Sequence, residues 1–215
     1  MNNLAIYGAG GFGREVCMMV NQINQHKMLY KVIGYFDDSK QKGCVIGHHE
    51  VLGGIKELNS YPEDIFLVIA LGNPVAKSMI FLSIENDKVK FPVLIHPSCI
   101  IGTDNVTIGE GSIICAGSIL TVDITIGNHV ILNLGCTVGH DTKIGSYSSL
   151  MPSVNVSGEV ELGEGVYCGT GVRIINQLKV GNNTIVGAGG VVSKSLPSNC
   201  TAVGIPAKPI KYHNE

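Results

Sequence analysis

The chain has 215 residues, of which 45% are apolar and 15% charged, a composition that is typical of a globular protein and excludes a largely disordered chain. A formal charge of −2 gives no broad electrostatic surface for duplex nucleic acid or anionic lipid, so we expect neither nucleic-acid binding nor membrane insertion. The 28 glycines, the lack of tryptophan and the low aromatic content of 6% indicate a repetitive architecture with many tight turns.

The N-terminal segment and the cysteines bear on the compartment. Residues 1–14 lack the basic segment, apolar run and cleavage site of a secretory signal, and the longest apolar run, residues 65–71, is too short to span a bilayer. The cysteines are odd in number and contain no Cys-x-x-Cys pair, which favours reduced thiols over disulfides or a thiolate metal site. We therefore expect a cytoplasmic protein without a bound metal.

The first part of the chain alternates short strands with helices. Four β-rich runs and two helix-compatible stretches follow one another, at residues 4–7, 14–25, 32–36, 65–70, 75–85 and 91–95. This alternation predicts a small Rossmann-like βαβ domain with a parallel sheet over residues 1–96.

A glycine-rich motif, Gly8-x-Gly10-x-x-Gly13, follows the first expected strand and opens the first expected helix. Asp37 and Asp38 end the next strand. In this context the motif can offer backbone N–H groups to a phosphate and a carboxylate to a hydroxylated ring, although a tight turn alone would also need glycines. Because the domain is only half of a full dinucleotide-binding domain, we expect a single nucleotide, such as the UDP of a sugar nucleotide, rather than NAD.

The second part of the chain follows a six-residue period. Every sixth residue from Ile108 to Val192 is apolar, and the residue four positions further into each hexad is small or β-branched, with Leu178 as the larger exception. An α-helix cannot keep this period on one face, whereas a solenoid of short strands can. We predict a parallel β-helix over residues 97–215 with eighteen residues per coil and about five coils. The spacing does not give its handedness, and the crossover rule alone favours a right-handed helix.

His140 is the candidate catalytic residue within the repeats. It lies two residues after the inward Val138, so its side chain should project from a corner with Asp141 beside it. An imidazole can act as a general base near neutral pH, and an adjacent carboxylate can orient it, although an exposed histidine is often only solvated. Asp123, Asp141 and Glu159 fall one coil apart, so we expect some of these carboxylates to turn outward or find partners.

Six motifs together resemble one enzyme family. They are the glycine-rich opening and the segments Gly-Tyr-Phe-Asp-Asp, Gly-Asn, His-Pro-Ser, Val-Gly-His-Asp and Gly-Ile-Pro-Ala-Lys, at residues 8–15, 34–38, 72–73, 96–98, 138–141 and 204–208. With the uninterrupted hexapeptide repeat, they resemble the NeuD/PglD group of sugar acetyltransferases over nearly the full length of the chain. The resemblance implies a left-handed β-helix, acetyl-CoA as the donor, and a homotrimer with active sites between neighbouring β-helices.

The resemblance also implies roles for individual residues. His140 corresponds to the general base, Asp141 to its partner, and the backbone amide of Gly158 to the donor that stabilises the oxyanion. The end that binds CoA corresponds to Gly187, Ala188, Gly189 and Lys208, with Lys194 as a further candidate. The site for the acceptor's nucleotide corresponds to Gly8, Gly10, Gly11, Asp37, Asp38, Gly72, Asn73 and Lys77, and for Lys77 a solvated helix residue is an equally good interpretation.

Two other chemistries receive less support from the sequence. A zinc site of the carbonic anhydrase type needs three imidazoles, and only His129 and His140 fall inside the repeats. A covalent acetyl-cysteine would need a reactive thiol, but Cys136 and Cys168 occupy inward positions, where they should pack as small hydrophobic groups. We therefore favour direct transfer without a covalent intermediate.

The resulting hypothesis is an acetyl-CoA-dependent N-acetyltransferase that acts on a nucleotide-linked amino sugar, such as a UDP-4-amino-4,6-dideoxy sugar, in surface glycan synthesis. Two alternatives stay open, an O-acetyltransferase for a sialic-acid-like sugar and a non-catalytic sugar-nucleotide binding protein. An NAD oxidoreductase is disfavoured because no catalytic Tyr-Lys pair can be placed. The chain departs from the family at Ser149, nine residues after His140, where a second histidine is often present. This departure leaves the acceptor, and the choice between amine and hydroxyl, undecided.

Overall fold

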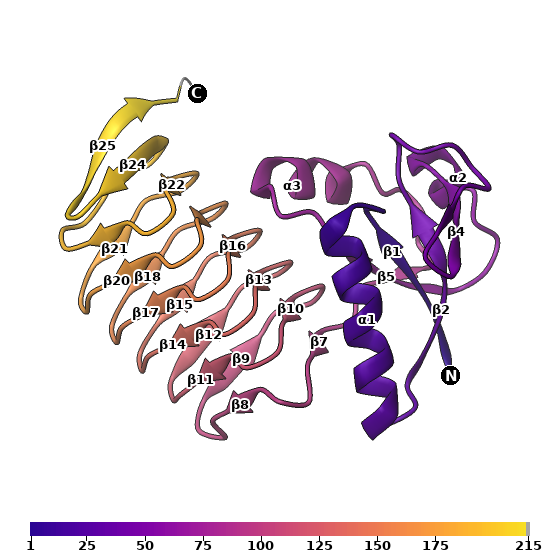
Figure 1. The fold of residues 1–215 in the computed structure, drawn as a ribbon, viewed down its shortest axis with the longest axis horizontal. Coiled ribbons are helices and arrows are strands. Elements are labelled where there is room, and N and C mark those ends of the chain that lie inside the picture. Colours follow the sequence, from indigo (N-terminus) through magenta and orange to yellow (C-terminus); the bar gives the residue numbers. More distant parts are fainter. Residues whose placement is uncertain (214–215) are drawn as a thin grey trace.

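The computed structural model describes residues 1–213, in which an α/β domain is followed by a parallel β-solenoid (Figure 1). The α/β domain has one six-stranded sheet in the order β3-β4-β2-β1-β5-β6, parallel except for the β3–β4 pair. Its elements are β1 (Asn2–Tyr7), α1 (Gly11–His26), β2 (Tyr30–Phe36), β3 (Val45–Ile46), β4 (His49–Gly53), α2 (Ile55–Asn59), β5 (Ile65–Ile69), α3 (Pro74–Leu82) and β6 (Val89–Lys90). The predicted Rossmann-like domain is confirmed, and the β3–β4 hairpin and α2 are additions to it.

Successive residues of each strand point to opposite sides of this sheet, and helices cover both of the apolar faces that result. Val20 of α1 packs in one cluster with Leu4 and Ile6 of β1. Ala5 of β1 belongs to a second cluster, on the other face, with Leu58 of α2. The carboxyl ends of the parallel strands, and the loops that follow them, therefore lie at one edge between these two layers.

The solenoid has three sheets, one on each side of a three-sided coil. The first solenoid sheet contains β7 (Leu94–Ile95), β10 (Ile113–Ile114), β13 (Ile131–Leu132), β16 (Ser149–Leu150), β19 (Tyr167–Cys168), β22 (Ile185–Val186), β24 (Cys200–Gly204) and the antiparallel β25 (Ala207–Tyr212). The second contains β8 (Ile100–Ile101), β11 (Ile119–Leu120), β14 (Thr137–Val138), β17 (Asn155–Val156), β20 (Arg173–Ile174) and β23 (Val191–Val192). The third contains β9 (Val106–Ile108), β12 (Ile124–Ile126), β15 (Lys143–Ile144), β18 (Glu161–Leu162) and β21 (Lys179–Val180).

The register of the solenoid is eighteen residues per coil, as predicted. Ile113 pairs with Ile131, and Ile131 pairs in turn with Ser149. Five coils have a strand on all three sides, and further strands extend the first and second sheets. The first strand of the solenoid, β7, ends at Ile95, so the solenoid begins slightly before the boundary predicted at residue 96.

Both predicted inward series form the interior of the solenoid. The apolar residues at six-residue spacing from Ile114 to Val192 are at most 3% exposed, and the second series is buried except for the larger Leu178, which is partly buried. The inward serines have hydrogen-bond partners: Ser148 Oγ donates to Gly163 O at 3.0 Å and accepts from Val166 N at 3.1 Å. The repeat therefore gives each coil a closed interior and leaves its corners and outer faces for function.

The α/β domain packs directly on the first solenoid sheet. Ile113 and Ile131, on the outer face of that sheet, belong to the same buried cluster as Val16 and Val20 of α1. Within residues 1–213, no helix combines the length and the apolar character needed to cross a membrane. The cytoplasmic location expected from the sequence stays a prediction.

Candidate active site

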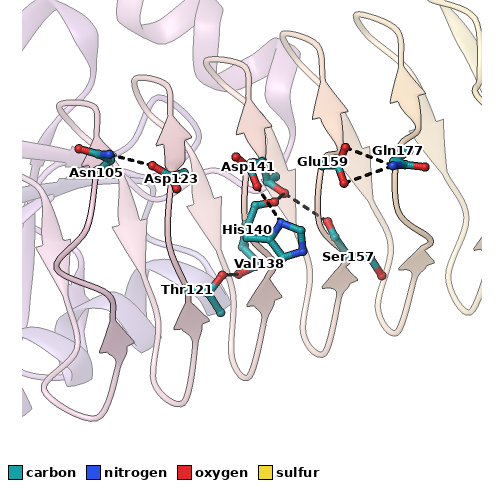
Figure 2. Close-up of polar contacts among 10 residues, drawn as sticks. Asn105, Thr121, Asp123, Val138, His140, Asp141, Ser157, Glu159 and Gln177 are labelled. Carbon is teal, nitrogen blue, oxygen red and sulfur yellow. Dashed lines mark hydrogen bonds and ion pairs between the residues drawn. The ribbon is translucent and has the colours of Figure 1, made fainter.

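His140 and Asp141 form a hydrogen-bonded pair at an outer corner of the solenoid, just after β14 (Figure 2). His140 Nδ1 lies 2.8 Å from Asp141 Oδ2, and the two side chains are 56% and 57% exposed. When Nδ1 donates to the carboxylate, Nε2 carries the free lone pair. The corner fixes the pair through the main chain, since Asp141 N donates to Val122 O and Glu159 N donates to His140 O. The predicted outward projection of His140 is confirmed.

The carboxylates one coil away on either side of Asp141 each have a neutral partner (Figure 2). Asn105 Nδ2 donates to Asp123 Oδ1 at 2.8 Å, and Gln177 Nε2 lies 3.2 Å from both carboxylate oxygens of Glu159. The expected column of like charges is thus accommodated by an amide at each end and by His140 in the middle. These partners leave Asp141 available to His140.

Gly158 lies directly under the imidazole. A Cβ atom built on Gly158 would be 2.4 Å from His140 Nε2, so only glycine leaves room for the ring. Gly158 O accepts from Gln177 N, whereas Gly158 N–H makes no hydrogen bond to any residue within the described part of the chain. A free N–H beside a histidine is the arrangement that oxyanion stabilisation needs.

The glycines of the predicted phosphate loop fall into two groups. Gly8 has φ +105°, and a Cβ on Gly13 would lie 1.9 Å from Gly8 O, so the fold itself requires both. Gly10 and Gly11, at the start of α1, face open space, because a Cβ on either would meet nothing within 4 Å. No side chain caps this helix N-terminus. Its N–H groups are therefore available to an anion.

Asp37 and Asp38 hold the loops around this site. Asp37 accepts from Ala9 N at 2.8 Å and from Ser39, and Asp38 accepts from the Tyr7 hydroxyl and from Ile55 N. Burial acts to raise the pKa of Asp37, but the hydrogen bonds from Ser39 and Ala9 outweigh it and hold the pKa below its usual value. Both carboxylates also line a shallow cavity of about 280 Å³ that contains three lysines: Lys40, Lys42 and Lys56. That these carboxylates bind a hydroxylated ring of the acceptor's nucleotide stays a prediction.

Gly72 and Asn73 lie at a larger cavity between the two parts of the molecule. Asn73 caps α3, since its Oδ1 accepts from Ala76 N at 3.1 Å. The cavity has a volume of about 460 Å³, and the solenoid side of it includes Tyr167 and Ile185, on the outer face of the first solenoid sheet. The sequence analysis missed these solenoid residues. Tyr167 lies eighteen residues after Ser149, and Ile185 lies eighteen residues after Tyr167. This spacing was the signal that the three residues share one face of the solenoid.

The structure corrects the interpretation of Lys77. Its side chain is 0% exposed, and its Nζ contacts Ser148 O at 3.2 Å and Ser149 Oγ at 2.9 Å. Burial places the pKa of this amine well below its usual value. Lys77 is therefore neither a solvated helix residue nor a residue exposed to a nucleotide. The sequence held one signal, because Lys77 lies four residues before Phe81 and so shares a face of α3 with it.

Comparisons with known proteins place the chain in a family. Residues 3–84 match the family described as the PglD N-terminal domain. Over 119 residues, 54% of this chain, the sequence is 36% identical to the UDP-N-acetylbacillosamine N-acetyltransferase of Bacillus subtilis (strain 168), and the match spans about half, 52%, of the length of that curated relative. The acetyltransferase domain of PglB from Neisseria gonorrhoeae FA1090, solved with acetyl coenzyme A, is 31% identical with a TM-score of 0.88, and the match covers 98% of this chain and 100% of that domain. The chain belongs to this family of hexapeptide-repeat sugar acetyltransferases.

A further relative in the family comes from Caulobacter crescentus. PerB, solved in complex with CoA and GDP-perosamine, is 29% identical with a TM-score of 0.87, and the match covers 98% of each chain. Variants of that perosamine N-acetyltransferase with one histidine replaced by Asn or Ala have also been solved with CoA and GDP-perosamine. Membership of the family gives the handedness that the spacing left open: the solenoid is a left-handed β-helix.

The cysteines of the repeat are interior groups, as their inward positions in the repeat predicted. Cys136 and Cys168 are both 0% exposed. Burial raises the pKa of Cys136 to about 11 and that of Cys168 to about 12, so neither forms the thiolate that a covalent acetyl intermediate requires. Within residues 1–213, no three His, Cys, Asp or Glu side chains are grouped so as to hold a metal ion.

The C-terminal end of the solenoid holds the residues that the resemblance assigns to CoA. Gly187, Ala188 and Gly189 follow β22, and Gly189 has φ +68°. Lys208 lies on β25, paired with Val203 of β24, and is exposed. This end belongs to the first solenoid sheet, whereas His140 follows a strand of the second. Binding of CoA by these residues stays a prediction.

Proposed function

We propose that this protein transfers the acetyl group of acetyl-CoA to the amine of a nucleotide-linked amino sugar in glycan biosynthesis, with His140 as general base. The observation that carries the proposal is the His140–Asp141 pair at 2.8 Å with a free Gly158 N–H beneath it. The relatives support an amine acceptor, because one is named an N-acetyltransferase and another was solved with GDP-perosamine bound.

The site residues would divide the chemistry as follows. The amine attacks the thioester carbonyl and forms the C–N bond, while His140 Nε2 takes the proton of the amine. Asp141 stabilises the resulting imidazolium, and Gly158 N–H donates to the oxyanion. The C–S bond then breaks, its electron pair stays on sulfur, and the imidazolium returns the proton so that CoA leaves as a thiol. No protein group is acetylated in this sequence.

The acceptor would lie across the α/β domain. The helix N-terminus at Gly10 and Gly11 would bind the diphosphate, because its N–H groups are free and nothing fills the space above them. The loop at Asn73 opens into the cavity of about 460 Å³, which offers room for the sugar. Lys208, with Gly187 to Gly189, would bind CoA at the far end of the solenoid.

The position of His140 supports a homotrimer. The acceptor cavity lies outside the first solenoid sheet, whereas His140 follows β14 of the second, so the two face different sides of the prism. A neighbouring protomer can bring its own His140 to the cavity. Ile100 of β8 and Ile175, just after β20, are 63% and 42% exposed on the side of the second sheet that a partner protomer would cover.

The experiment that tests the function measures release of CoA from acetyl-CoA with UDP-, dTDP- and GDP-linked 4-amino-4,6-dideoxy sugars and with free sialic acids. We expect turnover with one amino-sugar nucleotide, reduced by about 10²–10⁴-fold in His140→Ala, and unchanged in His26→Ala on the distant end of α1. A base-labile product would mean ester formation and would favour the O-acetyltransferase. No release with any acceptor would contradict the proposal and favour a binding protein.

The trimer is tested by mixing two inactive variants. Gly10→Asp places a carboxylate at the expected phosphate site without a steric clash, and His140→Ala removes the base. If each site joins two protomers, a refolded equimolar mixture should regain roughly a quarter of the wild-type rate, because each interface draws both intact halves one time in four. A mixture that stays inactive would place the whole site in one chain.

A further inference from the structure

The walls of the larger cavity come from two separate parts of the chain. Asn73 and Val75, at the start of α3, form one wall, and Met151, Tyr167 and Ile185 of the solenoid contribute to the other. The two walls are not joined by a short stretch of chain. The width of the cavity therefore depends on how α3 sits on the first solenoid sheet.

Lys77 joins these walls by hydrogen bonds. It lies one turn of α3 after Asn73, which forms part of the first wall, and its Nζ reaches Ser148 O at 3.2 Å and Ser149 Oγ at 2.9 Å. Ser149 begins β16, two residues before Met151 of the opposite wall. The contact thus lies immediately behind both walls, and Lys77 itself is completely buried.

The next contact of α3 with the solenoid is between aromatic rings. Phe81, one further turn along, packs on His129 with ring centroids 4.5 Å apart and on Tyr147 at 5.9 Å. Apolar contacts are not directional, and helices packed in this way can shift by small amounts. Hydrogen bonds from one amine to a main-chain carbonyl and a hydroxyl fix both distance and direction.

A buried amine is costly to the fold. Removing Lys77 from water disfavours its charged form, and its Nζ makes no ion pair with a carboxylate within residues 1–213. A methionine of similar volume would fill the same space without this cost. The presence of lysine therefore calls for a function that packing alone does not supply.

We propose that Lys77 is a positioning residue that sets the geometry of the acceptor cavity by tying α3 to β16 through Ser148 and Ser149. The inference rests on the proposed function, because it concerns where the acceptor sugar is held. It assigns Lys77 a role in acceptor binding that acts through Asn73 and Val75, without direct contact between the lysine and the substrate. It also explains how Ser149 is used in a chain that lacks the second histidine.

The test compares wild type with Lys77→Met, Ser149→Ala and the double variant. We expect the acceptor KM to rise about tenfold in Lys77→Met, as for the loss of one or two buried hydrogen bonds, while the KM for acetyl-CoA stays unchanged. The double variant should bind the acceptor no more weakly than Lys77→Met, because the two residues act as one pair. Hydrogen exchange of residues 72–82 should become faster in Lys77→Met.

Two controls separate positioning from stability. Lys31→Met removes an exposed lysine on β2, and Ile126→Ala destabilises the solenoid interior away from α3. Both should leave the acceptor KM unchanged, even if Ile126→Ala lowers the melting temperature as much as Lys77→Met does. An unchanged acceptor KM in a Lys77→Met enzyme that turns over would overturn the inference.

The failure of the proposed function would look different, since wild type itself would then release no CoA. In that case the exchange measurement still decides the structural part of the inference. Unchanged exchange over residues 72–82 in Lys77→Met would show that the lysine does not hold α3, and the inference would be wrong. Faster exchange confined to this segment would support the conclusion that Lys77 links α3 to β16.

Discussion

The two parts of this molecule place their functional residues by different means. In the solenoid, the orientation of a side chain follows from its position in the coil, so that His140 points outward and Cys168 inward. In the α/β domain, a residue such as Lys77 takes its environment from a distant strand. The comparison shows that in a repeat the local pattern already contains the tertiary contact, because each coil packs on a copy of itself. A single helix such as α3 has no such copy.

The largest effect should come from the shared interior of the coils. Leu132→Ala removes a completely buried side chain from the solenoid core, and we expect the free energy of unfolding to fall by about 2–5 kcal/mol. Urea unfolding followed by circular dichroism measures this change. The matched control is Ile205→Ala, whose side chain is 78% exposed and which should change the value by less than about 0.5 kcal/mol. Equal effects at both positions would contradict the inward orientation of Leu132 in the coil.

The next effect concerns the corner that carries the His140–Asp141 pair. Gly158→Ala places a methyl group 2.4 Å from His140 Nε2 and must displace the imidazole. We expect kcat to fall about 10²-fold or more with little change in either KM, since the interaction lost belongs to the transition state. Gly163→Ala is the control, because its Cβ would clash with Asn182 at a different corner and should cost stability only. A Gly158→Ala enzyme with normal kcat would remove this corner from the mechanism.

A smaller effect is expected from the contact between the two parts. His129 is surrounded by Phe81, Phe91 and Tyr147, and burial, followed by the nearby Lys77, lowers its pKa to about 4. The unfolded chain binds a proton at this histidine below pH ~6.5 and the folded protein does not. Stability should therefore fall by roughly 1–3 kcal/mol as the pH drops from about 6.5 to about 4.

The measurement is the free energy of unfolding at several pH values for wild type and His129→Phe. The free energy of unfolding of wild type should fall relative to that of His129→Phe as the pH falls, since only wild type carries the buried imidazole. Parallel curves would show that His129 is not kept neutral by the fold. The other six histidines affect both proteins equally and cancel in the comparison.

The smallest effect is expected at the interior thiols. Cys168→Ala removes a completely buried sulfur and should lower stability slightly while leaving kcat unchanged. Acetyl-CoA turnover per folded molecule checks this, with Cys136→Ala as its partner. Loss of turnover at full solubility would revive the covalent mechanism.

The sequence predicted the solenoid more fully than the α/β domain. The period of six gave the inward series, the eighteen-residue coil and the corner position of His140, because in a repeat these follow from counting. The partners of Asp123 and Glu159 lie one coil further along the solenoid on each side, so the same counting reaches them. By contrast, the burial of Lys77 depends on the packing of α3 against β16. Its partner Ser148 is seventy-one residues away in the chain, and no local sequence pattern predicts such a contact. The handedness also lay outside the sequence spacing, since mirror-image coils share the same period.

The eighteen-residue register fixes distances along the solenoid axis. Each coil advances the chain by one strand spacing of about 4.8 Å, and the distance between His140 and the glycine-rich end at Gly187 is set by the number of coils between them. That distance can change only in whole steps, because a partial coil would turn the interior residues outward. With CoA bound at that end as proposed, a donor with a longer or shorter arm would call for the insertion or removal of a complete coil of eighteen residues.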